Sequence, residues 1–358
     1  MGSIIGRAEE FCRRFNLQAP ILLAPMAGLP APQLSVAVAG AGGLGACGAV
    51  LMSPAQIADW ADEVRRGTEH GFQLNTWIPD APPQRDAANE ARLRALLADF
   101  GPAVSPQAGD ARPPDFAQQC EAMLQAAPAA ISSVMGLFAP HFRRELKERD
   151  IAWFANVSTL AEARAAEAAG ADVVVVQGSE AGGHRAAFEA ERAERCLVGL
   201  MALLPAVVDA LSIPVVAAGG IADARCLAAA LLLGASAVQV GTAFLRCPEA
   251  GLDPAWAAAL ARTAPEDTVV SRVFSGRPGR SLATAYVCAA TAASAPPPAP
   301  YPVQRGLTAP MRSAALATHD LRGMQAWAGQ GAARARAAPA AEVVRELWSG
   351  AKQLLRQE

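Results

Sequence analysis

Residues 173–184 read Val-Val-Val-Val-Gln-Gly-Ser-Glu-Ala-Gly-Gly-His, a run of β-branched residues that passes into a glycine-rich loop. Such a run is typical of a strand covered on both faces, as in a parallel sheet. Similar apolar runs lie on either side of it, separated by stretches with helical spacing. Together they predict eight strands, at 21–23, 46–50, 72–75, 130–133, 151–155, 173–177, 214–218 and 237–240. Eight strand–helix units favour an α/β fold of the (β/α)8 TIM barrel type, with a doubly wound open sheet as the alternative.

Residues that start and end helices support these units. Ser53-Pro54-Ala55-Gln56 and Thr159-Leu160-Ala161-Glu162 have the form of capping boxes, and Asp223 is a further helix N-cap. Gly170 and Gly234 stand where two of the helices are expected to end.

The chain departs from this alternation beyond residue 253. A proline-rich stretch at 292–301 precedes a short helical region at 305–327. We expect this part to be a lid or insertion rather than a second independent core. The predicted division is a barrel over 1–252, a lid and substrate region over 253–324, and C-terminal helices over 325–358 that pack back on the barrel.

Composition excludes several classes of protein. Of 358 residues, 52% are hydrophobic and 18% are charged, which is too apolar for a disordered chain. The net charge is −2 and the 31 basic residues are scattered, so we expect no nucleic-acid partner. No apolar run reaches the ~18 residues of a membrane-spanning helix, so we expect no membrane partner.

The cysteines and the first residues favour a cytoplasmic protein. The seven cysteines form no CxxC pair, which argues against a disulfide framework or a zinc site and fits a reducing compartment. Glu9, Glu10, Arg13 and Arg14 stand where a secretory signal would need its apolar stretch. We expect a cytoplasmic monomer or homodimer.

Two glycine pairs predict a phosphate site. In a parallel barrel, function lies on the loops after the strands, and the last two loops commonly bind phosphate. Gly219-Gly220 follows the seventh predicted strand and Gly241-Thr242 follows the eighth. Glycine allows backbone N–H groups to approach a phosphate closely. Tight turns need glycine in any case, but the two pairs together favour phosphate binding.

The loop after the sixth strand ends in His184, beside the predicted phosphate site. A histidine there can donate to an anion or move a proton near neutral pH. A solvated histidine in a flexible turn is the alternative interpretation. His70, His141 and His319 have no such context, and we expect them to be solvated or helical.

A second glycine motif has the form of a dinucleotide-binding fingerprint but lies between the wrong secondary-structure elements. Gly40-Ala41-Gly42-Gly43-Leu44-Gly45 matches GxGxxG. A dinucleotide fingerprint follows a strand and opens a helix, whereas this motif follows a helix and precedes a strand. We expect it to end that helix and not to bind NAD.

The scarcity of lysine narrows the chemistry further. Lys147 and Lys352 are the two lysines, and neither follows a strand, which argues against Schiff-base and pyridoxal-phosphate enzymes. Clustered His and Asp ligands are missing at the strand ends, so we expect no metal. A phosphate-bearing cofactor that supplies its own chemistry remains, and flavin mononucleotide (FMN) is the natural candidate in such a barrel.

Several motifs spread over residues 20–331 together resemble the nitronate monooxygenase family, formerly called 2-nitropropane dioxygenases. They are Ala24-Pro25-Met26-Ala27-Gly28, Ala41-Gly42-Gly43-Leu44-Gly45, the stretches 177–185, 217–223 and 239–244, Ser275-Gly276-Arg277, Tyr301-Pro302 and Trp327-Ala328-Gly329-Gln330-Gly331. The resemblance implies an FMN-binding barrel with a lid. It implies oxidation of alkyl nitronates by O2, without NAD(P)H, to an aldehyde or ketone plus nitrite, with propionate 3-nitronate and nitroalkanes as candidate substrates.

The resemblance also implies roles for individual residues. His184 falls on the catalytic histidine of the family. The expected cofactor-binding residues are Ala24, Pro25, Met26, Asn75, Gln177, Gly182, Gly183, Gly219, Gly220, Gln239, Val240, Gly241 and Thr242. Tyr301 and Ser275 are expected to contact the substrate. The apolar Met26, Trp77, Met135 and Phe138 suggest a dry pocket, although ordinary barrel packing would also explain them.

The sequence departs from the family pattern at the lid, where the family often carries a tyrosine and a lysine. Arg305 and Ala309 stand near those positions, a difference that concerns substrate choice. Two kinds of relative share the scaffold: enoyl-[acyl-carrier-protein] reductases open with Gly-Gly-Met in place of Ala24-Pro25-Met26, and NADH:quinone reductases lack the run 180–184. An NAD(P)H-dependent flavin reductase, and a barrel that binds FMN without turnover, stay as alternatives.

Overall fold

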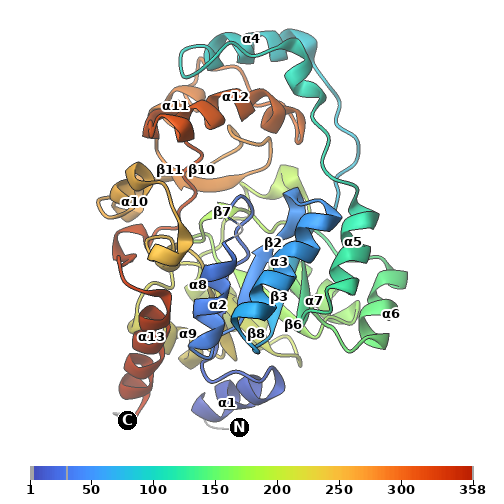
Figure 1. The fold of residues 1–358 in the computed structure, drawn as a ribbon, viewed down its shortest axis with the longest axis vertical. Coiled ribbons are helices and arrows are strands. Elements are labelled where there is room, and N and C mark those ends of the chain that lie inside the picture. Colours follow the sequence, from blue (N-terminus) through green and yellow to red (C-terminus); the bar gives the residue numbers. More distant parts are fainter. Residues whose placement is uncertain (1–3, 30, 357–358) are drawn as a thin grey trace.

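Eight parallel strands form the centre of the computed structural model, which describes residues 4–29 and 31–356 (Figure 1). Their order in the sheet is β1 (Ile21–Leu23), β9 (Ala237–Val240), β8 (Val215–Ala218), β6 (Val173–Gln177), β5 (Ala152–Val157), β4 (Ala130–Val134), β3 (Phe72–Trp77) and β2 (Gly45–Gly48). A parallel bridge between Leu22 and Leu44 joins the two ends of this sheet. The predicted (β/α)8 barrel is therefore confirmed.

Because successive residues of a strand point to opposite faces of the sheet, the barrel has an inner apolar core and an outer one. Val173 and Val175 of β6 pack in one apolar cluster with residues from most of the other strands, which can meet only inside the barrel. Val174 and Val176 belong to the outer cluster, with the helices. The ring of Phe15 packs edge-on against Phe154 at 5.1 Å and fills the amino-terminal end of the barrel. Free space is therefore left at the carboxyl end of the strands.

Helices follow most strands and cover the barrel. They are α2 (Pro32–Gly40), α3 (Pro54–Gly67), α5 (Phe116–Gln125), α6 (Pro140–Glu148), α7 (Leu160–Ala168), α8 (Leu200–Val208) and α9 (Ala224–Leu232), with α1 (Ile4–Arg14) before β1. Both predicted capping boxes form, at Ser53 and at Thr159. Asp223 caps α9 by accepting from two backbone N–H groups. The C-terminal helix α13 (Ala340–Leu355) packs against α9 and α2.

A lid covers the carboxyl end of the barrel and combines two distant parts of the chain. Helices α10 (Pro254–Leu260), α11 (Ala285–Ala290) and α12 (Val303–Ala317) come from the C-terminal third, and α4 (Ala87–Leu97) comes from the segment after β3. Figure 1 shows α4 lying over α11 and α12. Leu93 of α4 shares an apolar cluster with Tyr286 and Leu307. The division of the chain at residues 253 and 325 stays a prediction, and packing adds α4 to the lid.

A small antiparallel sheet lies under the lid helices. Its strands are β10 (Thr268–Ser271), β11 (Gly279–Leu282) and β7 (Gly183–His184), so the loop after β6 belongs to it. The sequence does not predict this sheet, because a two-residue strand such as β7 has no periodic signal.

Several predicted strand bounds differ from the structure by one or two residues. The second strand, predicted over 46–50, covers Gly45–Gly48, because Ala49–Leu51 form a 3-10 turn. The third and fifth strands end at Trp77 and Val157, two residues later than predicted.

Candidate active site

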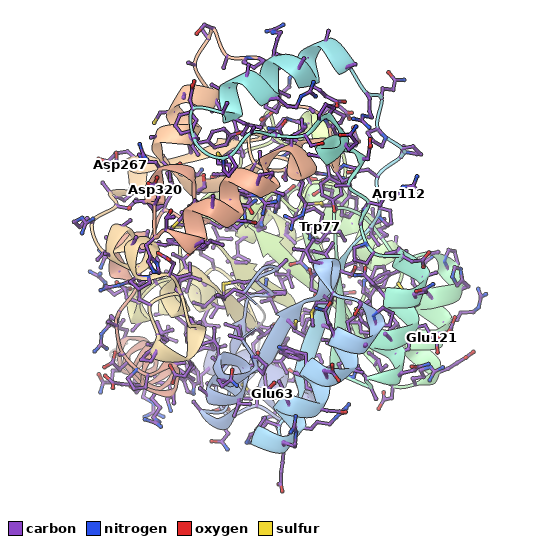
Figure 2. The ribbon with its side chains drawn as sticks, turned by 45° about the horizontal axis from the view of Figure 1, so that its top comes forward. Glu63, Trp77, Arg112, Glu121, Asp267 and Asp320 are labelled. Carbon is purple, nitrogen blue, oxygen red and sulfur yellow. The ribbon has the colours of Figure 1, made fainter. Side chains whose placement is uncertain are left out.

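The inward-facing residues at the carboxyl ends of the strands form the floor of a cavity of about 310 Å³ between barrel and lid. Because alternate residues of a strand face the same side, the last inward positions can be read from the register. They are Ala24, Asn75, Trp77, Val134, Asn156, Gln177, Ala218 and Gln239, and all of them line the cavity. Figure 2 shows Trp77 near the middle of the molecule, whereas Glu121 lies toward its edge.

Backbone N–H groups without a partner gather after β8 and β9. Gly219 and Gly220 have φ angles of +115° and +69°, which other residues rarely adopt. Thr242 and Ala243 begin a 3-10 turn. Within residues 4–29 and 31–356, the N–H groups of these four residues donate to no protein acceptor. A Cβ added at Gly219 would lie 3.1 Å from the backbone nitrogen of Ala181, so the space there suits a bare backbone. The arrangement fits a phosphate group.

His184 lies in an aromatic and hydroxyl environment. Its Nε2 atom is 2.8 Å from the Oγ of Ser275, and its ring centroid is 4.5 Å from that of Trp77 and 4.7 Å from that of Trp327. Burial, and secondarily the charges of Arg305 and Arg277, lower the pKa of His184 to about 3. The imidazole is therefore neutral at neutral pH and can either accept a proton or donate a hydrogen bond.

The side chains of Gln177 and Arg185 hold the loop that carries His184. The Nε2 of Gln177 donates to the carbonyl of His184, and its Oε1 accepts from the N–H of Ala186, both at 2.9 Å. Arg185 is 1% exposed and donates to the carbonyls of Gly178 and Gln177. Both ends of the Gln177 amide are thus already bonded within the loop. That Gln177 contacts a flavin stays a prediction. The second hydrogen of its Nε2 is available for such a contact.

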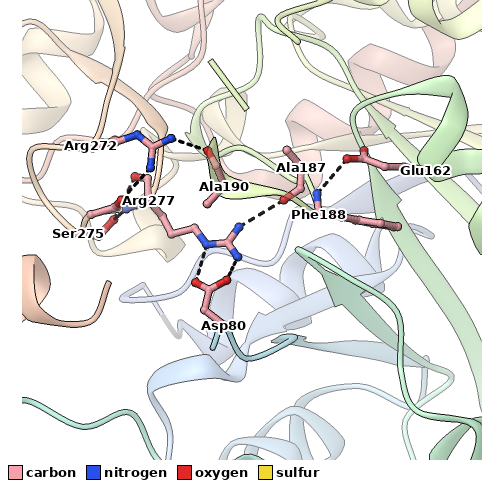
Figure 3. A network of polar contacts seen from close by, with 9 residues as sticks. Asp80, Glu162, Ala187, Phe188, Ala190, Arg272, Ser275 and Arg277 are labelled. Atoms are coloured by element: carbon pink, nitrogen blue, oxygen red, sulfur yellow. Dashed lines mark hydrogen bonds and ion pairs between the residues drawn. The ribbon is translucent and has the colours of Figure 1, made fainter. Parts of the chain in front are cut away.

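An ion pair joins the segment after β3 to the turn that carries Ser275 (Figure 3). The buried Arg277 donates from Nε to Asp80 at 2.8 Å and from Nη1 to the carbonyl of Ala187. Its backbone N–H donates to the Oγ of Ser275 at 3.2 Å. These contacts fix the hydroxyl that faces His184. Asp80 was not among the predicted site residues, because no local pattern in the sequence indicates a partner 197 positions away.

One face of α12 forms the lid side of the cavity. Arg305, Arg312 and Leu316 recur at helical spacing and line it, next to Tyr301. Arg312 donates to Thr308, to Gln325 and to the carbonyl of Arg305. Neither arginine was among the predicted site residues, although Arg305 was noted as a departure from the family pattern.

The cavity brings together every predicted catalytic and cofactor-binding residue, and also Tyr301. Their roles stay predictions. Ser275 does not line the cavity and instead lies behind His184. Of the predicted apolar walls, Met26 and Trp77 line the cavity, whereas Met135 and Phe138 are buried elsewhere. The segment 40–45 ends α2 and leads into β2, in the order that the sequence predicted.

Two further features of the described residues concern metal ions and membranes. Among residues 4–29 and 31–356, no group of three or more His, Cys, Asp or Glu side chains is placed to hold a metal ion. In the same residues, no helix combines the length and the apolar character needed to cross a membrane.

Comparison with known proteins identifies relatives over almost the whole chain. A family model described as nitronate monooxygenase matches residues 10–350. The chain is 39% identical over 356 residues to a nitronate monooxygenase of Pseudomonas aeruginosa, covering 95% of this chain and 98% of that protein. A solved structure of nitroalkane oxidase from Streptomyces ansochromogenes is 33% identical with a TM-score of 0.87, covering 96% and 98%. FabK from Thermotoga maritima is 26% identical with a TM-score of 0.75, covering 97% of each chain.

Proposed function

Because the chain belongs to the nitronate monooxygenase family, and is therefore a flavin-dependent oxidoreductase, we propose that it binds FMN and oxidises alkyl nitronates with O2. The C–N bond is cleaved, the carbon leaves as an aldehyde or ketone, and the nitrogen leaves as nitrite. Small nitronates such as propionate 3-nitronate, and neutral nitroalkanes, are the proposed substrates. One observation carries the proposal: a single cavity unites backbone N–H groups that have no acceptor in the described part of the chain with a half-buried, neutral histidine.

The loops after β8 and β9 would hold the cofactor. Gly219, Gly220 and Thr242 offer backbone donors to the FMN phosphate, and the glycines leave room for it. The amides of Asn75 and Gln239 line the floor, where a polar ring system needs hydrogen-bond partners. When bound, FMN supplies the redox chemistry of the reaction.

His184 handles the substrate, and Ser275 permits either of its neutral tautomers. If the Ser275 hydroxyl donates to Nε2, the Nδ1–H is left as a donor for the oxygens of a nitronate. If Nε2–H donates to Ser275, Nδ1 is left as a base that can remove a proton from a neutral nitroalkane. The hydroxyl can take both roles because the carbonyl and the N–H of Arg277 each lie 3.2 Å from its oxygen.

Anaerobic mixing tests the proposed reaction. Purified protein is mixed with a nitronate and, separately, with NADH, while flavin absorbance is recorded. We expect the nitronate to reduce the flavin, and NADH to do so slowly or not at all. Rapid reduction by NADH alone would assign a flavin reductase. Reduction by neither would leave a flavin-binding protein without this activity. Release of FMN on denaturation identifies the cofactor.

A further inference from the structure

Arg305 brings a positive charge to the cavity without a counterion in the described part of the chain. Its side chain lines the cavity. Within residues 4–29 and 31–356, its guanidinium donates to no protein acceptor and forms no ion pair. Burial lowers the pKa of Arg305, but a guanidinium stays protonated at neutral pH. A half-buried charge without a partner is unfavourable for the fold, and an anion bound in the cavity would supply the missing partner.

Arg312, on the same helix as Arg305, has hydrogen-bond acceptors within the protein. It also lines the cavity, but it donates to three neutral oxygens, those of Thr308, Gln325 and the Arg305 carbonyl, at 3.1–3.2 Å. The Nε2 of Gln325 is buried without an acceptor and belongs to a cavity-lining residue. None of the described residues that line the cavity carries a carboxylate. The lid wall therefore offers positive charge and a spare amide donor, with no negative charge opposite.

We propose that Arg305 is the specificity-determining residue that binds the anionic group of the substrate. Its planar fork of donors matches two oxygens on one atom, as in a nitronate or another planar oxyanion. That the anion is a nitronate rests on the proposed function, whereas the binding of a planar oxyanion does not. Two roles are then divided between two residues: Arg305 supplies a permanent charge, and His184 stays neutral for proton transfer or hydrogen bonding.

Three variants of the flavin-loaded protein test the proposal. Arg305→Gln removes the charge, Arg305→Lys keeps it without the planar fork, and Arg322→Gln removes an exposed lid charge that is paired with Asp320. Sodium nitrate serves as an unreactive planar oxyanion, and its binding is measured by calorimetry. We expect nitrate affinity to fall about tenfold or more in Arg305→Gln, less in Arg305→Lys, and not at all in Arg322→Gln. For a nitronate, KM should rise in Arg305→Gln by a similar factor, with kcat changed less.

Thermal unfolding gives a readout that separates binding from support of the fold. Loss of an unpaired, half-buried charge should leave the melting temperature of Arg305→Gln equal to or above that of the parent protein. A clearly lower melting temperature would overturn the proposal and assign Arg305 a structural role. Unchanged nitrate affinity and unchanged KM would overturn it equally. If nitrate binding depended on Arg305 but the parent protein did not turn over nitronates, the anion site would stand and the proposed function would fail.

Discussion

The Nε2 atom of His184 lies 2.8 Å from the hydroxyl oxygen of Ser275, 91 positions along the chain. Ser275 sits in the connection between β10 and β11, and Arg277 fixes it in turn. The orientation of this imidazole is therefore set by the small sheet under the lid, although His184 lies on the loop that follows β6 of the barrel.

Replacement of Ser275 by alanine should weaken catalysis without loss of the flavin. The imidazole loses one hydrogen bond, which is worth about 1 kcal/mol, so kcat/KM for a nitronate should fall about fivefold. Steady-state kinetics and flavin content measure this. Ser281→Ala is the matched control, because Ser281 is also buried but its hydroxyl donates to the Leu282 carbonyl next to it rather than to a group of the site. Equal losses in both variants would mean that Ser275 does not act through His184.

The variant His184→Asn should separate two substrates. Asparagine keeps a hydrogen-bond donor but cannot take up a proton. Oxidation of a neutral nitroalkane should therefore fall by the ~10²–10⁴-fold that general-base catalysis typically supplies. Oxidation of the pre-formed nitronate should suffer less, because that substrate arrives deprotonated. The rates of the variant and the parent protein are compared for both substrates at one pH. An equal loss of rate for both substrates would exclude a role of His184 as a base.

Acid should destabilise the protein through His184. The folded-state pKa of about 3 is depressed below the usual value of 6.5, so between these values the unfolded chain binds a proton that the folded chain does not. Stability is then complete above pH 6.5 and decreases as the pH falls. From pH 7 to 5 this one group should cost about 2 kcal/mol.

Urea unfolding at both pH values checks this contribution. His184→Asn should lose less stability than the parent protein on going from pH 7 to 5. His141→Asn, which changes an exposed histidine on α6, should behave like the parent. An identical pH dependence in all three proteins would refute the neutral, buried imidazole.

A glycine substitution can test the phosphate site. Gly219→Ala should lower flavin content, because the added Cβ occupies the cradle and strains a φ of +115°. Gly170→Ala is the control for strain alone, since Gly170 has a φ of +90° and its Cβ would meet nothing within 4 Å. Both variants should lose about 1–2 kcal/mol of stability. Flavin content per protein, measured by absorbance, should fall in Gly219→Ala only. An equal fall in Gly170→Ala would mean that backbone strain, and not loss of the phosphate site, lowers the flavin content.

Local patterns in the sequence predicted the barrel and its floor. The run at 173–177, the capping boxes at Ser53 and Thr159, and the paired glycines after β8 and β9 depend on neighbours a few residues away. Strand alternation then decides which residue at each strand end faces inward. For this reason the predicted cofactor-binding residues line one cavity, even though their contacts with a cofactor remain predictions.

The structure of the lid could not be predicted from the sequence, because it depends on contacts between distant segments. The pairing of β7 with β11, the ion pair of Asp80 with Arg277, and the packing of α4 on α12 all join distant segments. The Gln177 amide illustrates the same limit. Its position at the end of a strand was predictable, but its bonds to the backbone on both sides of Arg185 depend on how the loop folds back.

The two-residue strand β7 has a consequence for how substrate can enter. By connectivity His184 follows β6 of the barrel, but by hydrogen bonding it pairs with Gly279 of the lid sheet. A lid movement wide enough to admit a substrate would therefore displace the histidine together with β11. Any such opening would therefore change the position of His184 relative to the barrel residues that line the cavity, so access for the substrate and the arrangement of the reacting groups are coupled through this one strand.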